Sequence, residues 1–335
     1  MPPRRRRSRR ARATLRLNDI RINASIERWP VAGTFVIARG AKTHVDVVVV
    51  VATDGTSLGR GEGTPIYYKG ETPETCLAQI EALPAAIDRL SLQSLLPAGA
   101  ARNAVDCALW DLEAKRAGLP VWSLAGLSEP RPLVTALTVS IGEPDKMEAD
   151  ARRCAERTTL VKVKLAGKDD VARLAAVRRG ALDARLIVDA NEAWTGLDIA
   201  AEAASLLPFG IELIEQPVKR GAEALLDGLS SPIPLGADES IQDRTDLDRC
   251  VERYQAINIK LDKAGGLTEA LALRAEARAM GFKVMLGCML GTSLGIAPAF
   301  LAAQDADWVD LDGALLLARD REEQLTLSNG LLSPR

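Results

Sequence analysis

The chain has 335 residues, 47% of them hydrophobic, and a formal net charge of −2. This composition allows a large core, and no apolar run reaches the roughly 18 residues that a membrane-spanning helix needs. VDVVVVVA at 45–52 is instead predicted to be a buried strand. The five cysteines are scattered and form no CxxC pair, so neither a disulfide framework nor a zinc site is predicted. A reducing, cytoplasmic location is therefore expected.

The N-terminal segment MPPRRRRSRRARATLR contains eight arginines and no acidic residue, which leaves a net charge of about −10 on residues 17–335. No apolar segment follows it, so a secretory signal is not predicted. We interpret residues 1–16 as a disordered tail, or as the product of a start codon placed too early. A basic arm can attract nucleic acid, but no basic and aromatic pattern continues into the chain, so a nucleic-acid partner is not expected.

Residues 17–130 are predicted to form an α+β domain. TLRLNDIRI at 14–22 alternates like a strand, and THVDVVVVVATDG at 43–55 ends in an Asp-Gly turn signal. Helices are expected over 73–91 and 100–117, the second with apolar residues at helical spacing and a final glycine, Gly118. The only histidine, His44, lies in this domain and is interpreted as structural.

From residue 133 onward, short apolar runs alternate with amphipathic segments. The alternation predicts a parallel sheet, and eight units predict an α/β barrel of the (β/α)7β or TIM-barrel type over residues 131–313. Residues 314–335 are expected to pack on the preceding domain. The eight runs are LVTALTVSI, LVKVKL, RLIVDAN, IELIEQP, IPLGADES, AINIKLDKAGG, KVMLGCM and DWVDLDG.

Charged residues stand at the ends of five consecutive runs, 22 to 26 residues apart, which is about one strand-helix unit. In a barrel these strand ends meet at one mouth. Three carboxylates there would repel one another unless they shared a cation, and hard oxygen ligands suit magnesium. One Mg²⁺ per site is therefore predicted. The five residues are Lys164, Asp189, Glu215, Asp238 and Lys260.

VKVKL at 161–165 places Lys162 and Lys164 on one face of a strand, because residues i and i+2 point the same way. The pentapeptide alone is also typical of an edge strand. Across the barrel, Lys260 would face Lys164, so that a substrate between them could lose a proton on one side and gain one on the other. Crowding by cations is expected to lower the lysine pKa, with Lys162 tuning Lys164 and helping to hold a substrate carboxylate.

The stretches VKVKLAG, VDAN, IEQP, ADES and NIKLDKAGG together resemble the enolase superfamily, specifically its muconate-lactonizing branch. The resemblance spans the whole barrel, and the preceding domain resembles the capping domain of that family. Members of this superfamily use a Lys or His base and magnesium to stabilise an enediolate. The resemblance also implies that Asn191 and Glu239 support the metal ligands.

Within the superfamily, the sequence is similar to dipeptide epimerases of the L-Ala-D/L-Glu type. This similarity implies proton transfer at the α-carbon of the C-terminal residue of a dipeptide. In DLDG at 310–313, Asp310 and Asp312 would hold the free ammonium group of the dipeptide. In IARGAKT at 37–43, Arg39 would bind the side-chain carboxylate of a glutamate.

The resemblance implies further pocket residues. Thr138 would touch the substrate from the first strand, and GCMLGTS at 287–293 would line the pocket through Met289. Gly291 stands where many relatives carry an acidic residue, so this wall is expected to be roomier or shaped for another side chain. TPIYYKG at 64–70 is expected to form a lid over the mouth.

Two alternatives stay open. On the same scaffold, o-succinylbenzoate synthase and N-acylamino acid racemase use the same lysines and metal on substrates that lack a free ammonium group, and DLDG favours the epimerase. The second alternative is a nucleic-acid-binding protein that acts through its arginine arm on an inactive barrel, which an intact set of lysines and carboxylates opposes. A small-molecule dipeptide is the expected partner, with no membrane and with a possible homo-oligomer.

Overall fold

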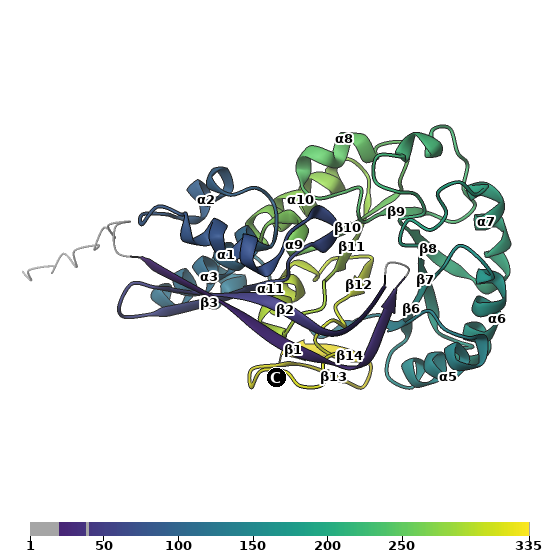
Figure 1. Cartoon of the computed structure of the whole chain (residues 1–335), viewed down its shortest axis with the longest axis horizontal. Coiled ribbons are helices and arrows are strands. Elements are labelled where there is room, and N and C mark those ends of the chain that lie inside the picture. The colour runs from purple at the N-terminus through teal and green to yellow at the C-terminus, as the bar shows by residue number, and fades with distance from the viewer. Residues whose placement is uncertain (1–19, 38–39, 335) are drawn as a thin grey trace, which may run out of the picture.

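The computed structural model describes residues 20–37 and 40–334 of the chain, and it consists of a cap and a barrel (Figure 1). In the cap, a three-stranded antiparallel sheet packs against helices. The cap elements are β1 (Arg21–Ile37), β2 (Gly40–Thr53), β3 (Leu58–Gly63), the 3-10 turn η2 (Tyr67–Lys69), α1 (Pro73–Glu81), α2 (Arg89–Leu95), α3 (Ala100–Ala117) and α4 (Val121–Leu124).

Eight parallel strands follow one another around the barrel in chain order. The backbone N–H of Ala136, beside the first strand, donates to the carbonyl oxygen of Val309 in the last strand at 2.7 Å, which brings the two edges together. The predicted barrel with an N-terminal cap is thus confirmed, and each of the eight apolar runs supplies one strand of the barrel. They are β5 (Leu137–Val139), β6 (Leu160–Lys164), β7 (Arg185–Asp189), β8 (Ile211–Glu215), β9 (Leu235–Ala237), β10 (Ala256–Ile259), β11 (Lys283–Gly287) and β12 (Trp308–Asp310).

Helices and 3-10 turns connect the strands and cover their outer face (Figure 1). The strands are buried on both faces, which explains why their sequences are continuously apolar. The connecting elements are α5 (Pro144–Ala155), α6 (Asp170–Gly180), α7 (Ile199–Ser205), η3 (Leu207–Phe209), η4 (Glu223–Leu226), η5 (Arg244–Asp246), α8 (Leu247–Cys250), α9 (Leu261–Ala264), α10 (Leu267–Ala279) and α11 (Ser293–Ala302).

Three glycines on β3 set the distance between the cap sheet and α3. Gly59, Gly61 and Gly63 alternate along the strand and therefore point to the same face. A Cβ atom at any of them would come within 2.2 Å of a backbone carbonyl oxygen between residues 100 and 108 of α3. The glycines thus allow a close approach that no larger residue would permit.

The β1–β2 hairpin reaches from the cap to the barrel (Figure 1). Its pairing register shifts after Pro30, and the chain there bonds to the segment that follows β12. Ala32 N–H donates to the carbonyl oxygen of Leu316, and Ala318 N–H donates to that of Pro30, each at 2.8 Å. The C-terminal segment thereby braces the hairpin over the barrel mouth, and it ends in a small sheet made of β13 (Leu325–Ser328), β14 (Leu331–Pro334) and β4 (Leu133–Val134).

The division at residues 130 and 313, and the assignment of 314–335 to the cap, stay predictions. The prediction of a single helix over 73–91 was wrong, because this segment contains α1 and the start of α2 with a break between them. Pro84 lies in the break, and proline lacks an N–H and disfavours helical backbone in the preceding residue. Asp88 then starts α2 by accepting a hydrogen bond from the Ser91 N–H at 2.7 Å.

The sequence predicted no disulfide framework. In the structure, all five cysteines are free thiols. Within residues 20–37 and 40–334, none of the helices combines the length and the apolar character that crossing a membrane requires. The cytoplasmic location stays a prediction.

Candidate active site

Three carboxylates meet at the C-terminal ends of adjacent strands. Asp189 ends β7, Glu215 ends β8 and Asp238 directly follows β9, and all three are buried. One carboxylate oxygen from each residue lies within 4.8 Å of the other two. Three anionic oxygen donors at this spacing fit a divalent cation that prefers hard ligands. The residues predicted as metal ligands therefore come together and can hold such an ion.

Two lysines flank this cluster. Lys164 Nζ lies 2.7 Å from Asp189 Oδ2, and Lys260 Nζ lies 2.7 Å from Asp238 Oδ2. Lys164 ends β6 and Lys260 follows β10, and these strands are four positions apart in an eight-stranded barrel. The two ammonium groups therefore approach the cluster from opposite sides.

Lys162 lies inside the cluster, with Nζ at 2.8 Å from Asp310, 2.6 Å from Glu215 and 3.1 Å from Asp189. Burial favours its neutral form, but these carboxylates outweigh burial and hold the pKa of Lys162 well above its ordinary value. The same balance raises the pKa of Lys260. The nearest charges to Lys162 and Lys260 are negative, so the lowering of the pKa expected from crowding by cations is not found at Lys260.

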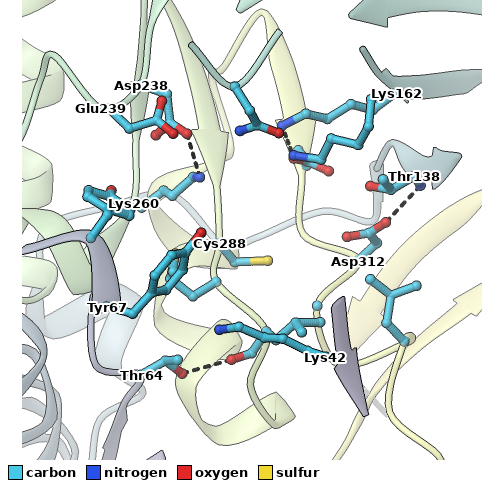
Figure 2. Close-up of a pocket in the computed structure, with 18 residues that line it drawn as sticks. Lys42, Thr64, Tyr67, Thr138, Lys162, Asp238, Glu239, Lys260, Cys288 and Asp312 are labelled. Carbon is cyan, nitrogen blue, oxygen red and sulfur yellow. Dashed lines mark hydrogen bonds and ion pairs between the residues drawn. The ribbon is translucent and has the colours of Figure 1, made fainter. Parts of the chain in front are cut away.

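The cluster opens into a pocket between the barrel mouth and the cap (Figure 2). Asp238 and Lys260 lie on one side of the pocket, and Lys162 and Asp312 lie on the other. Tyr67 enters from the cap. The pocket therefore combines a charged floor from the barrel with a wall from the cap.

The acid pair after β12 faces this pocket. Asp310 and Asp312 are 6% and 5% exposed, and Asp312 Oδ2 accepts a hydrogen bond from the Thr138 N–H at 2.8 Å. Burial and the negative charge of Asp310 raise the pKa of Asp312 to about 7. Oδ1 of Asp310 is buried and has no hydrogen-bond partner among the described residues. Two such carboxyl groups, one with an unused acceptor, suit a cationic group of a ligand.

The other pocket residues implied by the resemblance also lie at its wall. Asn191, Glu239 and Met289 all line the pocket, as does Thr138 on β5. The backbone N–H of Asn191 donates to Asp189 Oδ1 at 2.8 Å, which fixes one oxygen of that carboxylate. Arg39 lies outside the described residues.

The wall near Gly291 is filled by side chains of the cap and is not roomier, while the alternative of a wall shaped for another side chain stays a prediction. A Cβ atom at Gly291 would lie 3.2 Å from both Glu62 Oε1 and Thr64 Oγ1, so two cap side chains fill this space. Glu62 is held there by the N–H of Thr292 and by an ion pair with Arg321. A carboxylate from the cap therefore occupies the space that an acidic residue at position 291 would need.

Two residues that hold the carboxylates were missed in the sequence. Asn258 Nδ2 donates to Glu215 Oε1 at 2.7 Å, and Lys263 Nζ donates to Asp238 Oδ1 at 2.6 Å. Asn258 is two residues before Lys260, so alternation along the strand could have identified it. Lys263 returns to the site only through the turn of α9, which strand periodicity does not reveal.

Lys42 is a further pocket residue that was missed. It lines the pocket from β2, and its Nζ lies 4.5 Å from the centroid of the Tyr67 ring. Burial lowers the pKa of Lys42. No carboxylate among the described residues forms an ion pair with it, so a cation stands on the cap side without a counter-charge.

Comparison with protein families matches both parts of the chain. Residues 20–126 match the N-terminal domain of mandelate racemase / muconate lactonizing enzyme, and residues 146–333 match the enolase C-terminal domain-like family. The L-Ala-D/L-Glu epimerase of Escherichia coli (strain K12) is 44% identical over 91% of this chain and 97% of its own length. An N-acetyl-D-glutamate racemase of a Pseudoalteromonas species is 42% identical over 86% of this chain and 93% of its own length.

Solved structures of similar proteins also match most of this chain. An enolase family member from Agrobacterium tumefaciens with homology to dipeptide epimerases, with bound sodium and L-Ala-L-Glu, is 47% identical with a TM-score of 0.91. The match covers 94% of this chain and 98% of the Agrobacterium chain. A dipeptide epimerase from Enterococcus faecalis V583 complexed with Mg and L-Leu-L-Tyr is 30% identical with a TM-score of 0.86, covering 93% and 95%. The similarity therefore includes both the cap and the barrel.

Proposed function

This chain belongs to the mandelate racemase and muconate lactonizing enzyme family of the enolase superfamily, and on that premise we propose that it is a magnesium-dependent dipeptide epimerase. The isomerase class follows from the epimerases and racemases that resemble it over most of their length. The observation that carries the dipeptide assignment is the buried pair Asp310 and Asp312 beside the three-carboxylate cluster. A free ammonium group matches the charge and the hydrogen-bonding capacity of such a pair.

Asp189, Glu215 and Asp238 would hold Mg²⁺, the ion present in the similar Enterococcus faecalis epimerase. When bound, Mg²⁺ takes up the negative charge of these carboxylates and stabilises the charge that develops on the substrate carboxylate. Lys162 adds a fixed positive charge at the same place, since it is fully buried among them.

Lys164 and Lys260 would carry the protons. Because they stand on opposite sides of the cluster, an α-carbon held between them presents one face to each lysine. Because Mg²⁺ would take up the carboxylate charge that favours the protonated lysines, one lysine can stand as a neutral amine and remove the α-proton, and the other, as an ammonium, delivers a proton to the opposite face. One lysine gains a proton and the other loses one, and the α-carbon is inverted.

An acidic C-terminal residue is the substrate we favour. The ammonium of Lys42, which forms no ion pair with a carboxylate of residues 20–37 and 40–334, supports this choice because it can pair with a side-chain carboxylate of the substrate. The names of the two relatives above both include glutamate, and the Agrobacterium protein holds L-Ala-L-Glu. Arg39, three residues before Lys42, stays a predicted contributor.

An N-acylamino acid racemase is the second candidate, favoured by the 42% identity with the N-acetyl-D-glutamate racemase. Its substrate would place a neutral amide, in place of an ammonium group, near Asp310 and Asp312. A buried carboxylate gains less from a neutral donor than from a cation, so the acid pair favours the dipeptide.

Exchange of the α-proton in deuterated water distinguishes the two candidates. The wild-type enzyme with Mg²⁺ is given L-Ala-L-Glu or N-acetyl-L-glutamate, and proton NMR follows the rate at which the α-proton signal of each substrate is lost. We expect faster turnover of the dipeptide. Faster turnover of N-acetyl-glutamate would replace the epimerase with the racemase.

A further inference from the structure

Asp262 connects the strand end that carries Lys260 to the cap. It is the second residue of α9, two positions after Lys260. Its Oδ1 accepts hydrogen bonds from the backbone N–H of Thr64 and from Asn103 Nδ2, each at 2.8 Å. Asn103 lies on α3 and also donates to the carbonyl oxygen of Glu62 on β3 at 3.2 Å. One carboxylate therefore joins the barrel to both the sheet and the main helix of the cap.

Thr64 is the root of the segment 64–70 that forms the cap side of the pocket. It is buried, and its Oγ1 donates to the carbonyl oxygen of Leu290 at 2.8 Å. Asp262 therefore fixes the backbone of Thr64, while the loop after β11 fixes its side chain. Three residues further on, η2 brings Tyr67 and Tyr68 to the pocket wall.

The segment 64–70 lies on the Lys260 side of the pocket. In Figure 2, Tyr67 and Lys260 appear on the same side of the pocket, and Asp312 appears on the other. Tyr68 lines the same pocket as Asp238 and Lys260, and burial together with the charge of Asp238 raises its pKa. The bonds of Asp262 thus lead to groups around one of the two lysines.

We propose that Asp262 is a positioning residue that holds the segment 64–70 in register with Lys260, and so assembles one of the two proton-transfer sides of the pocket. The proposal rests on the two-lysine function above. Lys164 stands on β6, across the barrel from α9, so its geometry does not depend on this bond. A misplacement of about 1 Å at a reacting group can cost roughly 100-fold in rate.

The test is α-proton exchange from each epimer of Ala-Glu in deuterated water by Asp262→Ala. Exchange from the epimer that Lys260→Ala abolishes should slow by roughly 10- to 100-fold, and exchange from the other epimer should stay within about twofold of wild type. Asp262→Asn keeps an acceptor for the Thr64 N–H and should restore most of the lost rate. Asp262→Leu fills the space without an acceptor and should reproduce the asymmetry if Asp262→Ala does not fold.

Asp106→Ala is the matched control. Asp106 lies on α3 in the same cap–barrel interface, but it accepts hydrogen bonds from the N–H and Oγ1 of Thr268 on α10, at 2.9 and 2.6 Å, and from Gln93 Nε2 at 3.1 Å. A merely structural effect would slow both epimers alike in both variants. Equal slowing of the two epimers by Asp262→Ala or Asp262→Leu, or the same asymmetry in Asp106→Ala, would overturn the proposal. If the wild type exchanges neither epimer, the proposed function itself fails.

Discussion

The floor and the cap side of the pocket are held in place by different means. On the floor, charged groups stand on the ends of adjacent barrel strands and hold one another through buried ion pairs, such as Lys164 with Asp189. On the cap side, Lys42 comes from the β1–β2 hairpin, Thr64 from the segment that follows β3, and Tyr67 from the 3-10 turn η2. A rigid floor suits steps that every substrate shares, whereas a wall from another domain suits the choice of substrate. We therefore expect floor variants to stop the reaction and cap variants to change its selectivity.

The largest effect should come from the floor. Asp238→Asn removes one anionic ligand while keeping the shape of the side chain, so turnover with Mg²⁺ should fall by roughly 1000-fold or more. Asp227→Asn is the control, because Asp227 is an exposed carboxylate paired with Arg253. Circular dichroism should show both variants folded. Turnover by Asp238→Asn near the wild-type rate, or full activity after exhaustive chelation, would rule out the metal assignment.

The acid pair should give the next largest effect. Asp312→Ala removes a buried partner of the substrate ammonium and should cost about 2–5 kcal/mol in kcat/KM for Ala-Glu. N-acetylation of the dipeptide removes the same charge pairing from the other side. It should therefore cost the wild type heavily and Asp312→Ala little. Equal losses upon N-acetylation in both proteins would show that Asp312 does not bind the ammonium group.

The same contrast explains what could be predicted from the sequence. Each charged floor residue follows an apolar strand at a spacing of one strand-helix unit, so Asp189, Glu215 and Asp238 could be placed together without a structure. Lys263 could not, because it reaches Asp238 through a helical turn rather than along a strand.

The cap side was harder to predict because its contacts join segments far apart in the chain. Glu62 fills the space next to the Cα atom of Gly291, and only the packing of β3 against the loop after β11 brings these two residues together. Lys42 enters the pocket because the C-terminal segment braces the hairpin, and no periodicity in the sequence encodes that contact. The pKa of Lys260 was also misjudged, since the carboxylate of Asp238 outweighs the crowding by cations that the sequence suggests.

A cap variant should change selectivity rather than chemistry. Lys42→Ala should lower kcat/KM for Ala-Glu roughly tenfold and leave Ala-Leu nearly unchanged, because only the first substrate offers a carboxylate to Lys42. Lys42→Arg keeps the charge and should keep the preference. Arg39→Ala is predicted to act in the same direction. A similar loss for both dipeptides in Lys42→Ala would show that Lys42 supports the fold of the pocket wall and does not bind the side-chain carboxylate of the substrate.

The smallest effect should be on stability, in the interface between the two regions. Burial raises the pKa of Asp106 to about 6, above its ordinary value of 3.8. Between pH 4 and 6 the folded protein then binds a proton that the unfolded chain has lost, so this group makes the free energy of unfolding fall as pH rises through that range. Asp106→Asn should flatten this part of the curve, measured by urea unfolding. The exposed Asp248→Asn is the control, and an unchanged slope in Asp106→Asn would contradict the assignment.

The central claim is that two lysines on opposite strands each serve one face of the same α-carbon. Its most direct test is α-proton exchange from each separate epimer of Ala-Glu in deuterated water, followed by NMR for Lys164→Ala and Lys260→Ala. Each variant should lose exchange from one epimer and keep it from the other, and the two variants should be complementary. Exchange of both epimers at the wild-type rate by either variant would contradict the claim.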